Sequence, residues 1–295
     1  MRILQFGRVG QVGRELLEQA SAFGVAPIAF DKDEIDLADA DAVERLVLAT
    51  PDIEAVVNAA AYTAVDKCES EEELALAVNG AAPAAMARAC AARGIPIVHI
   101  STDYVFDGTK PAPYVEDDTV NPRSAYGRTK LAGEVGVREA CDRHIILRTS
   151  WVFARDGHNF VRTVLRLARE KGALRIVDDQ RGCPTPAQDI AHALLATLTR
   201  RPKDEAARWG TFHFCGDEPC SWADLAAATL KAAGPQGPKA SLARIATSEY
   251  PTPAERPKNS VMDCGKIARV YGLPPAPWRA RLETHVPALL ATLGT

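Results

Sequence analysis

Apolar runs and helical repeats alternate through the first half of this chain. Short apolar runs, each bounded by a turn former or a charged residue, predict strands at 2–6, 27–30, 55–58, 96–100 and 144–148. Between them, alanine-rich or amphipathic stretches predict helices at 14–20, 71–93 and 126–141. This alternation is typical of a parallel sheet with helices on both faces. The predicted fold class is therefore α/β, with a doubly wound parallel sheet.

The second half has a different pattern. Helical repeats predict helices at 160–171, 187–199 and 222–233, and prolines become frequent after residue 233. Apolar residues are interspersed among these prolines, which favours ordered loops between short elements. We expect this half to form a smaller region that folds against the open edge of the sheet.

Three glycines follow the first predicted strand in the run Gly7-Arg-Val-Gly10-Gln-Val-Gly13. A strand, a glycine turn and a helix are the context that a Rossmann-like dinucleotide site requires. Glycines let the backbone approach a pyrophosphate, whose charge the helix N-terminus favours. The spacing is Gly-x-x-Gly-x-x-Gly, so an ordinary glycine turn is the alternative. We expect residues 1–150 to form a dinucleotide-binding domain and residues 151–295 mainly a substrate-binding region, with some segments returning to the first.

The second strand ends at Asp31, about 20 residues past the glycines, where an acidic residue commonly binds the adenosine ribose. Lys32 follows it and Arg8 lies within the glycine loop, and either cation could offset a 2′-phosphate. Each alone is more often a solvated charge. We expect NADPH as the coenzyme, with NADH accepted.

Composition excludes several classes of protein. The 295 residues carry a net charge of −3 without a basic block, which argues against a nucleic-acid partner. No apolar run is expected to reach the ~18 residues of a membrane span, and the N-terminus shows no signal-peptide pattern. The seven cysteines are widely spaced without a Cys-x-x-Cys, and the six histidines are scattered. We therefore expect reduced thiols, no metal site and a cytoplasmic location.

Tyr126 and Lys130 lie four residues apart, which places both on one face of a helix. A tyrosine pKa near ~10 is too high for acid–base work at neutral pH, and a lysine charge about 4 Å away lowers it. The pair is a candidate general acid for a carbonyl group. Alone, the spacing is a weak signal, because most such pairs are ordinary surface residues of a helix.

Small and polar residues follow two of the predicted strands, in Asn58-Ala-Ala-Ala-Tyr62 and Ser101-Thr-Asp-Tyr104. Ligands of open parallel sheets bind beyond the carboxyl ends of the strands. Both segments are therefore candidates for the site, although tight packing alone also explains the alanines.

Taken together, these motifs resemble the extended short-chain dehydrogenase/reductases and, within them, the dTDP-4-dehydrorhamnose reductase family. The similarity runs nearly end to end. It includes Ala64-Val-Asp-Lys67 with Glu69, Ser101-Thr-Asp-Tyr-Val-Phe-Asp-Gly108, Tyr126-Gly-Arg-Thr-Lys-Leu-Ala-Gly-Glu134, Arg148-Thr-Ser-Trp-Val-Phe153, Asn159-Phe160, Asp179-Gln-Arg-Gly-Cys-Pro-Thr185 and Tyr250-Pro-Thr-Pro-Ala-Glu-Arg-Pro-Lys-Asn-Ser260.

The resemblance implies reduction of the C4 ketone of dTDP-4-dehydro-β-L-rhamnose to dTDP-L-rhamnose by NADPH or NADH, with Thr102, Tyr126 and Lys130 as catalytic residues. It implies that the coenzyme contacts Gly7, Arg8, Gly10, Gln11, Val12, Gly13, Asp31, Lys32, Asp36, Leu37, Asn58, Ala59, Ala60, Tyr62, Asn79, Tyr126 and Lys130. It implies that the dTDP-sugar contacts Thr63, Val65, Thr102, Asp103, Tyr104, Trp151, Asn159 and Arg256, with Arg256 at the diphosphate.

Three alternatives differ from this interpretation. The related 4,6-dehydratases carry Thr-Asp-Glu where this chain has Thr102-Asp103-Tyr104, so dehydration is disfavoured. A reductase of another nucleotide-linked 4-keto deoxysugar fits the same residues. A non-catalytic regulatory subunit of this fold is disfavoured because Tyr126 and Lys130 are both present.

Some members of the family dimerise through magnesium held by glutamates. Glu15 could match one of them, but Gln188-Asp189 offers glutamine at another. We expect no required metal and leave a homodimer possible.

Overall fold

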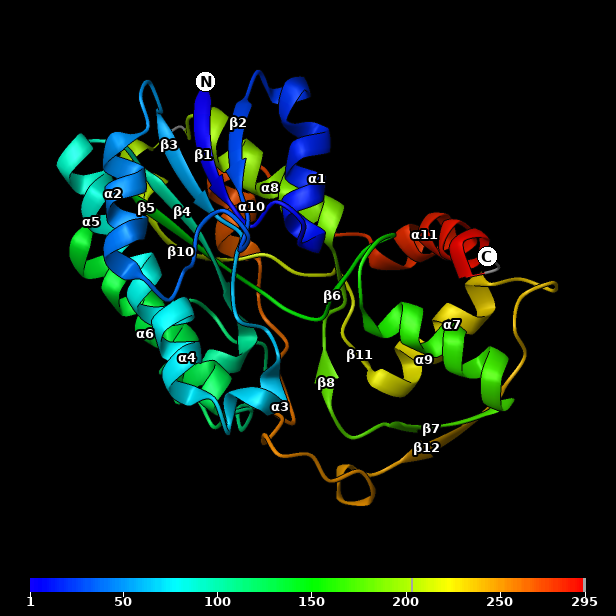
Figure 1. The fold of residues 1–295 in the computed structure, drawn as a ribbon. Coiled ribbons are helices and arrows are strands. Elements are labelled where there is room, and N and C mark those ends of the chain that lie inside the picture. Colours follow the sequence, from blue (N-terminus) through cyan, green and yellow to red (C-terminus); the bar gives the residue numbers. More distant parts are fainter. Residues whose placement is uncertain (203, 294–295) are drawn as a thin grey trace.

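The computed structural model describes residues 1–202 and 204–293, which form a large sheet domain and a smaller lobe beside it (Figure 1). Within this part of the chain, the main sheet has six strands in the order β10-β5-β4-β3-β1-β2, all parallel. Their bounds are β1 Arg2–Phe6, β2 Ala26–Phe30, β3 Ala55–Asn58, β4 Ile97–Thr102, β5 His144–Thr149 and β10 Gly210–His213.

Helices cover both faces of this sheet, as the alternating pattern predicted. One face carries α1 Gln11–Gln19, α8 Ala187–Thr199 and α10 Gly265–Tyr271, and the other carries α2 Ala40–Ala49, α5 Ala82–Arg93 and α6 Ala125–Ala140. Two separate apolar cores fill the space between the sheet and these layers. The fold is therefore a Rossmann-like doubly wound sheet, which confirms the predicted class.

The smaller lobe is built from short pieces. Its helices are α7 Phe160–Lys171, α9 Trp222–Ala232 and α11 Trp278–Leu293. Three two-stranded sheets join it to the large domain or brace it: β6 Val152–Phe153 with β9 Thr185–Pro186, β7 Ala173–Val177 with β12 Ser241–Ile245, and β8 Arg181–Gly182 with β11 Cys220–Ser221. We did not predict β12, α10 Gly265–Tyr271 and the long helix α11, because the many prolines after residue 233 indicated loops between short elements.

Three elements after residue 150 belong spatially to the large domain. Strand β10 extends the main sheet beside β5, α8 packs on α1, and α10 packs on β10. The chain therefore crosses between the two parts several times (Figure 1).

The predicted helix at 71–93 has an irregular centre. It consists of α4 Glu72–Leu76, a π-helical turn at Ala77–Ala81, and α5, and Gly94 ends it with φ +64°.

By length and composition alone the run Glu72–Arg93 could cross a membrane, although 56% of its most apolar window is buried inside the protein. The expectation that no apolar run reaches such a length was therefore wrong, because alanines raise the mean hydropathy of this core helix.

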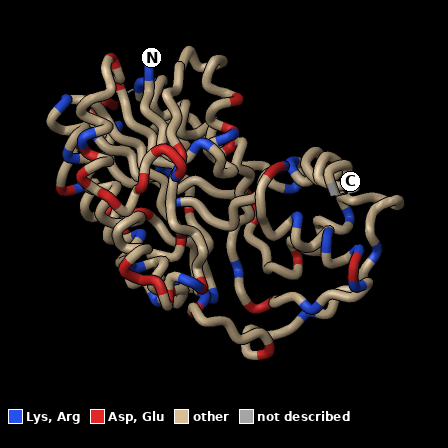
Figure 2. The backbone as a smooth tube through the Cα atoms, in the orientation of Figure 1, with Lys and Arg blue, Asp and Glu red and all other residues tan. Residues whose placement is uncertain are grey.

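The short helix α3 Val65–Cys68 precedes α4 at the lower edge of the large domain. Lys and Arg positions are interspersed with Asp and Glu positions along the backbone of both parts (Figure 2).

Candidate active site

A cavity of about 780 Å³ opens at the carboxyl ends of the parallel strands, between the large domain and the smaller lobe. Its size falls in the range of small-molecule and cofactor sites. Most of the predicted site residues line it, namely Gly7, Gly10, Gln11, Val12, Asp31, Lys32, Asp36, Leu37, Ala59, Ala60, Tyr62, Thr63, Val65, Thr102, Asp103, Tyr104, Tyr126, Lys130 and Trp151. Arg8, Gly13, Asn58, Asn79, Asn159 and Arg256 lie outside its wall.

The three glycines of the loop have different reasons to be glycine. Gly7 has φ +90°, and a Cβ there would lie 2.8 Å from the backbone of Ala59. A Cβ on Gly13 would lie 1.7 Å from the carbonyl oxygen of Gly7, so the start of α1 packs directly on the loop. Gly10 instead faces open space, because a Cβ there would have no neighbouring atom within 4 Å.

Gly10 is also the N-cap of α1 and provides no side chain to cap it. The first amide groups of α1 therefore have no side-chain partner at the cap, and the loop beside them leaves room for close approach. A helix N-terminus of this kind favours an anion such as a pyrophosphate. The loop fits the diphosphate of a dinucleotide coenzyme.

Asp31 follows β2 at the far end of the cavity. Its carboxylate accepts hydrogen bonds from the backbone nitrogens of Val9 (2.7 Å) and Lys32 (2.8 Å). Arg8 is paired with Glu34, at 3.0 Å between Nη2 and Oε2. Lys32 lines the cavity and forms no ion pair within the described chain, so its charge is uncompensated there.

Asn58 and Asn79 support the wall from behind. Asn58 Oδ1 accepts from the backbone nitrogen of Ala60 (3.1 Å). Asn79, in the π-helical turn, accepts from the backbone nitrogen of Tyr62 (2.8 Å) and donates to its carbonyl (3.1 Å). Both asparagines therefore shape the segment after β3, and neither is itself exposed to the cavity.

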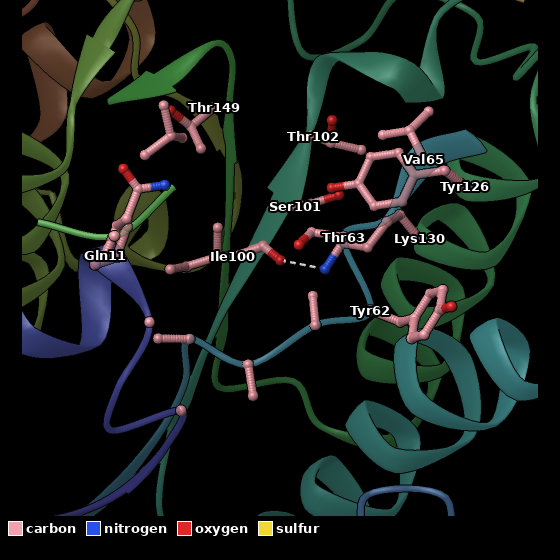
Figure 3. A pocket seen from close by; sticks show the side chains of 18 of the residues that line it. Gln11, Tyr62, Thr63, Val65, Ile100, Ser101, Thr102, Tyr126, Lys130 and Thr149 are labelled. Carbon is pink, nitrogen blue, oxygen red and sulfur yellow. Dashed lines mark hydrogen bonds between the residues drawn. The ribbon is translucent and has the colours of Figure 1, made fainter. Parts of the chain in front are cut away.

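The three predicted catalytic side chains converge on one side of the cavity (Figure 3). Thr102 ends β4, while Tyr126 and Lys130 lie one turn apart on α6. Ser124 caps α6 by accepting from the backbone nitrogen of Gly127 (3.2 Å). A Cβ on Gly127 would lie 2.3 Å from the carbonyl oxygen of Tyr104, so this glycine lets α6 approach the end of β4.

Lys130 is almost completely buried, and its ammonium nitrogen donates to the carbonyl oxygen of Ile100 at 2.6 Å. Burial lowers the pKa of Lys130 to about 8, although the carboxylate of Glu134 opposes this shift. Burial raises the pKa of Tyr126, which Thr102 opposes and Asp103 reinforces.

The structure therefore does not show the predicted lowering of the Tyr126 pKa by Lys130. The reason is geometric: Lys130 is turned toward Ile100 (Figure 3). Tyr126 remains protonated at neutral pH, which is the state that a general acid needs.

Asp103 is buried beside the hydroxyls of Thr102 and Tyr126, which are predicted to be catalytic. Its Oδ1 accepts from Thr102 Oγ1 at 2.9 Å, whereas its Oδ2 has no hydrogen-bond partner within the described residues. Burial raises the pKa of Asp103 to about 6. The Ser260 hydroxyl also interacts with this carboxylate and opposes the rise of its pKa. Oδ2 is buried and keeps acceptor capacity.

Trp151 lines another part of the cavity wall. Its backbone is in the left-handed region, which non-glycine residues rarely adopt. Its φ is +48°. The indole stacks on that of Trp222, with ring centroids 3.5 Å apart and planes 6° apart. On its other side, a Cβ on Gly182 would lie 2.4 Å from the indole. Backbone strain of this type is often found at functional sites.

Trp222 and its neighbours were not predicted from the sequence. Trp222, Leu225 and Phe160 come from α9 and α7 of the smaller lobe and complete the apolar part of the wall. The indole nitrogen of Trp222 donates to Gln180 Oε1 at 3.1 Å. Ser221-x-x-Asp224 forms a capping box at the start of α9, and this motif is a local signal that could have placed Trp222 at a helix end.

Arg256 and Asn159 have structural partners. The guanidinium of Arg256 makes two contacts of 2.9 Å with the carboxylate of Asp66. Glu255, the partner that its position in sequence suggests, instead pairs with Arg123 at 3.5 Å. Asn159 caps α7 and donates to Gln11 Oε1 at 3.1 Å, which links the smaller lobe to the glycine loop.

The residues around Glu15 do not fit a magnesium site. Arg155 Nη2 lies 3.5 Å from Glu15 Oε1 and already supplies a positive charge. Gln188 faces His285, and Asp189 is paired with Arg281. No group of three or more His, Cys, Asp or Glu residues suited to a metal occurs in the described part of the chain.

Known proteins resemble this chain over nearly its whole length. The model of the RmlD substrate binding domain family matches residues 1–290. The chain belongs to this family. A dTDP-4-dehydrorhamnose reductase of Sinorhizobium fredii is 43% identical over 294 residues, which cover 98% of each chain.

Solved structures agree. A dTDP-4-dehydrorhamnose reductase from Clostridium acetobutylicum superimposes with a TM-score of 0.91 at 36% identity, covering 98% of this chain and all of that one. A dTDP-4-dehydrorhamnose reductase from Bacillus anthracis in complex with NADP has a TM-score of 0.86 at 32% identity, covering 96% and 98%. The nearly complete coverage on both sides includes the large domain and the smaller lobe.

Proposed function

We propose that this protein is an NADPH-dependent reductase that converts the C4 ketone of dTDP-4-dehydro-β-L-rhamnose to the alcohol of dTDP-L-rhamnose. The observation that carries this proposal is one continuous cavity that joins the glycine loop to Thr102, Tyr126 and Lys130. The named relatives that match this chain over nearly its whole length support the same reaction.

The residues have distinct roles in this reaction. When bound, NADPH supplies the hydride that reaches the ketone carbon. Negative charge then grows on the carbonyl oxygen, and Tyr126 gives its phenolic proton to that oxygen. Thr102 donates a hydrogen bond to the same oxygen, where the developing charge makes it most effective. Lys130 holds the coenzyme ribose beside Tyr126.

Asp103 and Trp151 position the sugar. Asp103 Oδ2 accepts from a sugar hydroxyl, and the stacked pair of Trp151 and Trp222 supplies apolar area for the 6-deoxy side of the ring. Tyr104 occupies the position at which a dehydratase needs a second carboxylate, and its ring packs edge-on against Tyr126 at 5.5 Å between centroids. This arrangement favours ketone reduction over water elimination.

We assign the two parts of the protein accordingly. The sheet domain, with α8, β10 and α10, binds the coenzyme, and the lobe of α7, α9 and α11 closes on the sugar. All seven cysteines are unpaired and buried, which fits a reducing compartment such as the cytoplasm.

The experiment that tests the proposal is coenzyme oxidation with dTDP-4-dehydro-L-rhamnose, with the product identified by NMR. Other nucleotide-linked 4-keto deoxysugars serve as competitors. We expect the highest kcat/KM for the rhamnose precursor, with NADPH preferred over NADH by a modest factor because Lys32 is free and Asp31 is present. A higher kcat/KM for another 4-keto sugar would support the alternative reductase, and absence of turnover with every keto sugar would support a non-catalytic role.

A further inference from the structure

A short line of buried polar groups lies behind Lys130 and has no assigned role. His99 is on β4, three residues before Thr102, and is fully buried. Its Nδ1 lies 3.1 Å from Asn58 Nδ2, and its Nε2 lies 3.5 Å from Lys130 Nζ. Asn58, at the end of β3, is therefore connected through His99 to Lys130.

The orientation of Asn58 fixes the tautomer of His99. Asn58 Oδ1 accepts from the backbone nitrogen of Ala60 (3.1 Å), so the atom that faces His99 is the amide nitrogen, which only donates. Nδ1 of His99 must then accept. A neutral imidazole that accepts at Nδ1 carries its hydrogen on Nε2. The hydrogen on Nε2 points toward Lys130.

Lys130 responds differently in its two protonation states. A lysine ammonium has three donors and no acceptor, so it cannot pair with the N–H of His99. A neutral amine keeps one lone pair, which accepts from His99 Nε2 while an N–H of the amine donates to the carbonyl of Ile100 (2.6 Å). The neutral amine alone satisfies every contact of this buried line.

We propose that His99 is a positioning residue that is held as the Nε2–H tautomer by Asn58, presents a donor to Lys130 and thereby favours the neutral amine in the coenzyme-free enzyme. The inference rests on the proposed function, in which Lys130 holds the coenzyme ribose. A coenzyme that brings hydroxyl acceptors to Lys130 then changes the balance toward the ammonium, so coenzyme binding takes up a proton.

The surroundings of Lys130 allow this assignment. Glu134, one turn further along α6, is the carboxylate that favours the ammonium, but Arg148 of β5 holds it through two contacts of 2.8 Å. Arg138 also binds Glu134, at 3.0 Å. Tyr126 on α6 and Asp103 after β4 face the cavity on the other side.

The pKa values act in the same direction. Burial lowers the pKa of His99 well below its ordinary value, so the imidazole is neutral at physiological pH even beside an uncharged Lys130. Burial lowers the pKa of Lys130 to about 8, close to the working range. His99 is no path for protons to solvent, because both it and Asn58 are buried.

NMR of the coenzyme-free protein tests the tautomer directly. Long-range proton–nitrogen correlation with ¹⁵N-labelled histidine distinguishes the two neutral tautomers, and the spectrum of His99→Leu identifies the His99 signals. We expect Nε2–H with no protonation at neutral pH. An Nδ1–H tautomer, or an imidazolium at neutral pH, would overturn the proposal.

Titration of ¹³Cε-labelled lysine gives the second measurement. His99→Leu removes the N–H group that faces Lys130 and disfavours its ammonium form. The midpoint of the Lys130 titration should therefore rise by about one pH unit. Asn58→Asp keeps the acceptor for Ala60 but offers His99 an acceptor, which should turn it to Nδ1–H and also raise the Lys130 titration. If His99→Leu does not fold, the histidine spectrum of Asn58→Asp decides, because an unchanged Nε2–H tautomer there would show that residue 58 does not set the tautomer, whereas the introduced carboxylate charge raises the Lys130 pKa in either case.

His213→Leu is the matched control, since His213 is equally buried but contacts Arg148 and the carbonyl of Tyr114 rather than Lys130. We expect it to lower stability and leave the Lys130 titration in place. An equal shift in the control, or no shift in His99→Leu, would remove the role from His99.

The kinetic counterpart is the basic limb of kcat/KM against pH, which should move upward with the Lys130 titration in His99→Leu. The NMR measurements need no substrate. A protein that failed to reduce the proposed sugar would therefore still show whether His99 acts on Lys130.

Discussion

The two walls of the cavity are built in different ways. On the side that we propose for the coenzyme the wall includes residues with little or no side chain: Gly7 and Gly10 in the loop, and Ala59 and Ala60 after β3. On the sugar side the surface is made of side chains, with Trp151 and Trp222 stacked between two lobes. A site for a diphosphate needs amide groups and space, whereas a site for a deoxysugar needs apolar area and a few placed acceptors.

This difference makes the two walls sensitive to different changes. A methyl group added to the coenzyme wall collides with backbone or fills the place of the ligand. A change in the sugar wall acts through stacked rings that come from distant segments. A substitution on the proposed coenzyme side should therefore raise the KM for NADPH, and one on the proposed sugar side should raise the KM for the dTDP-sugar.

Tyr126→Phe should have the largest effect and alter neither wall. The ring remains, so binding of NADPH and sugar is retained, while the proton donor is lost. We expect kcat to fall by about 10²–10⁴-fold, the usual contribution of a general acid. Stopped-flow measurement of coenzyme oxidation and calorimetry of coenzyme binding check both parts. Turnover near that of the wild type would show that another group protonates the alkoxide.

The glycine pair tests the coenzyme wall. Gly13→Ala places a methyl 1.7 Å from a backbone oxygen and should cost about 3 kcal/mol or more of unfolding free energy. Gly10→Ala meets nothing within 4 Å and should change stability by less than about 0.5 kcal/mol. It should nevertheless raise the KM for NADPH roughly tenfold or more, or about 1.4 kcal/mol. Chemical denaturation and coenzyme kinetics distinguish the two, and an unaltered coenzyme KM in Gly10→Ala would argue against a pyrophosphate at this loop.

The same contrast explains how much the sequence could predict. Gly7, Gly10 and Gly13 are close in sequence and lie between the first strand and a helix, so their position predicted the coenzyme wall although their spacing left an ordinary glycine turn as the alternative. The stacking of Trp151 between Gly182 and Trp222 joins three distant segments, and no periodicity links them. The protonation of Tyr126 was also beyond the sequence, because it depends on burial and on the direction in which Lys130 points.

Asp103 should make stability depend on pH. Its pKa is raised from an ordinary value of 3.8 to about 6, so the folded protein binds the proton more tightly than the unfolded chain. Stability from this group is present below about pH 4 and is lost as pH rises through 6. Asp103→Asn should therefore increase the unfolding free energy at pH 8 by up to about 3 kcal/mol, with no gain at pH 4. Urea unfolding at both pH values measures it, and an equal gain at both would assign the effect to something other than ionisation.

Trp222→Leu tests the sugar wall. It removes the ring on which Trp151 stacks, and such aromatic pairs contribute about 0.5–1.5 kcal/mol. The KM for the dTDP-sugar should rise roughly 2- to 13-fold at that energy, while the KM for NADPH should stay unchanged. Trp209→Leu, at a tryptophan outside the cavity wall, is the control and should change neither constant. A rise confined to the coenzyme KM would contradict the division of the two walls.

Substitution of Arg256 should have the smallest effect on the KM for the dTDP-sugar. Its ion-pair partner Asp66 provides a matched second variant. The assignment of Arg256 to the substrate diphosphate remains a prediction from the sequence. The ion pair with Asp66 suggests a different role, in which Arg256 anchors the proline-rich segment 250–260 to α3 behind Tyr104. A partly exposed ion pair contributes about 0.2–1 kcal/mol.

If Arg256 is an anchor, Arg256→Ala and Asp66→Ala break the same contact, so each should raise the KM for the sugar less than about fivefold and by a similar factor. The double variant should then resemble either single one. If Arg256 instead binds the diphosphate, Arg256→Ala should raise that KM by more than about tenfold. Asp66→Ala should leave it unchanged or lower it, because the guanidinium is released to the ligand. We expect the first result, because both nitrogens that face Asp66 are already engaged.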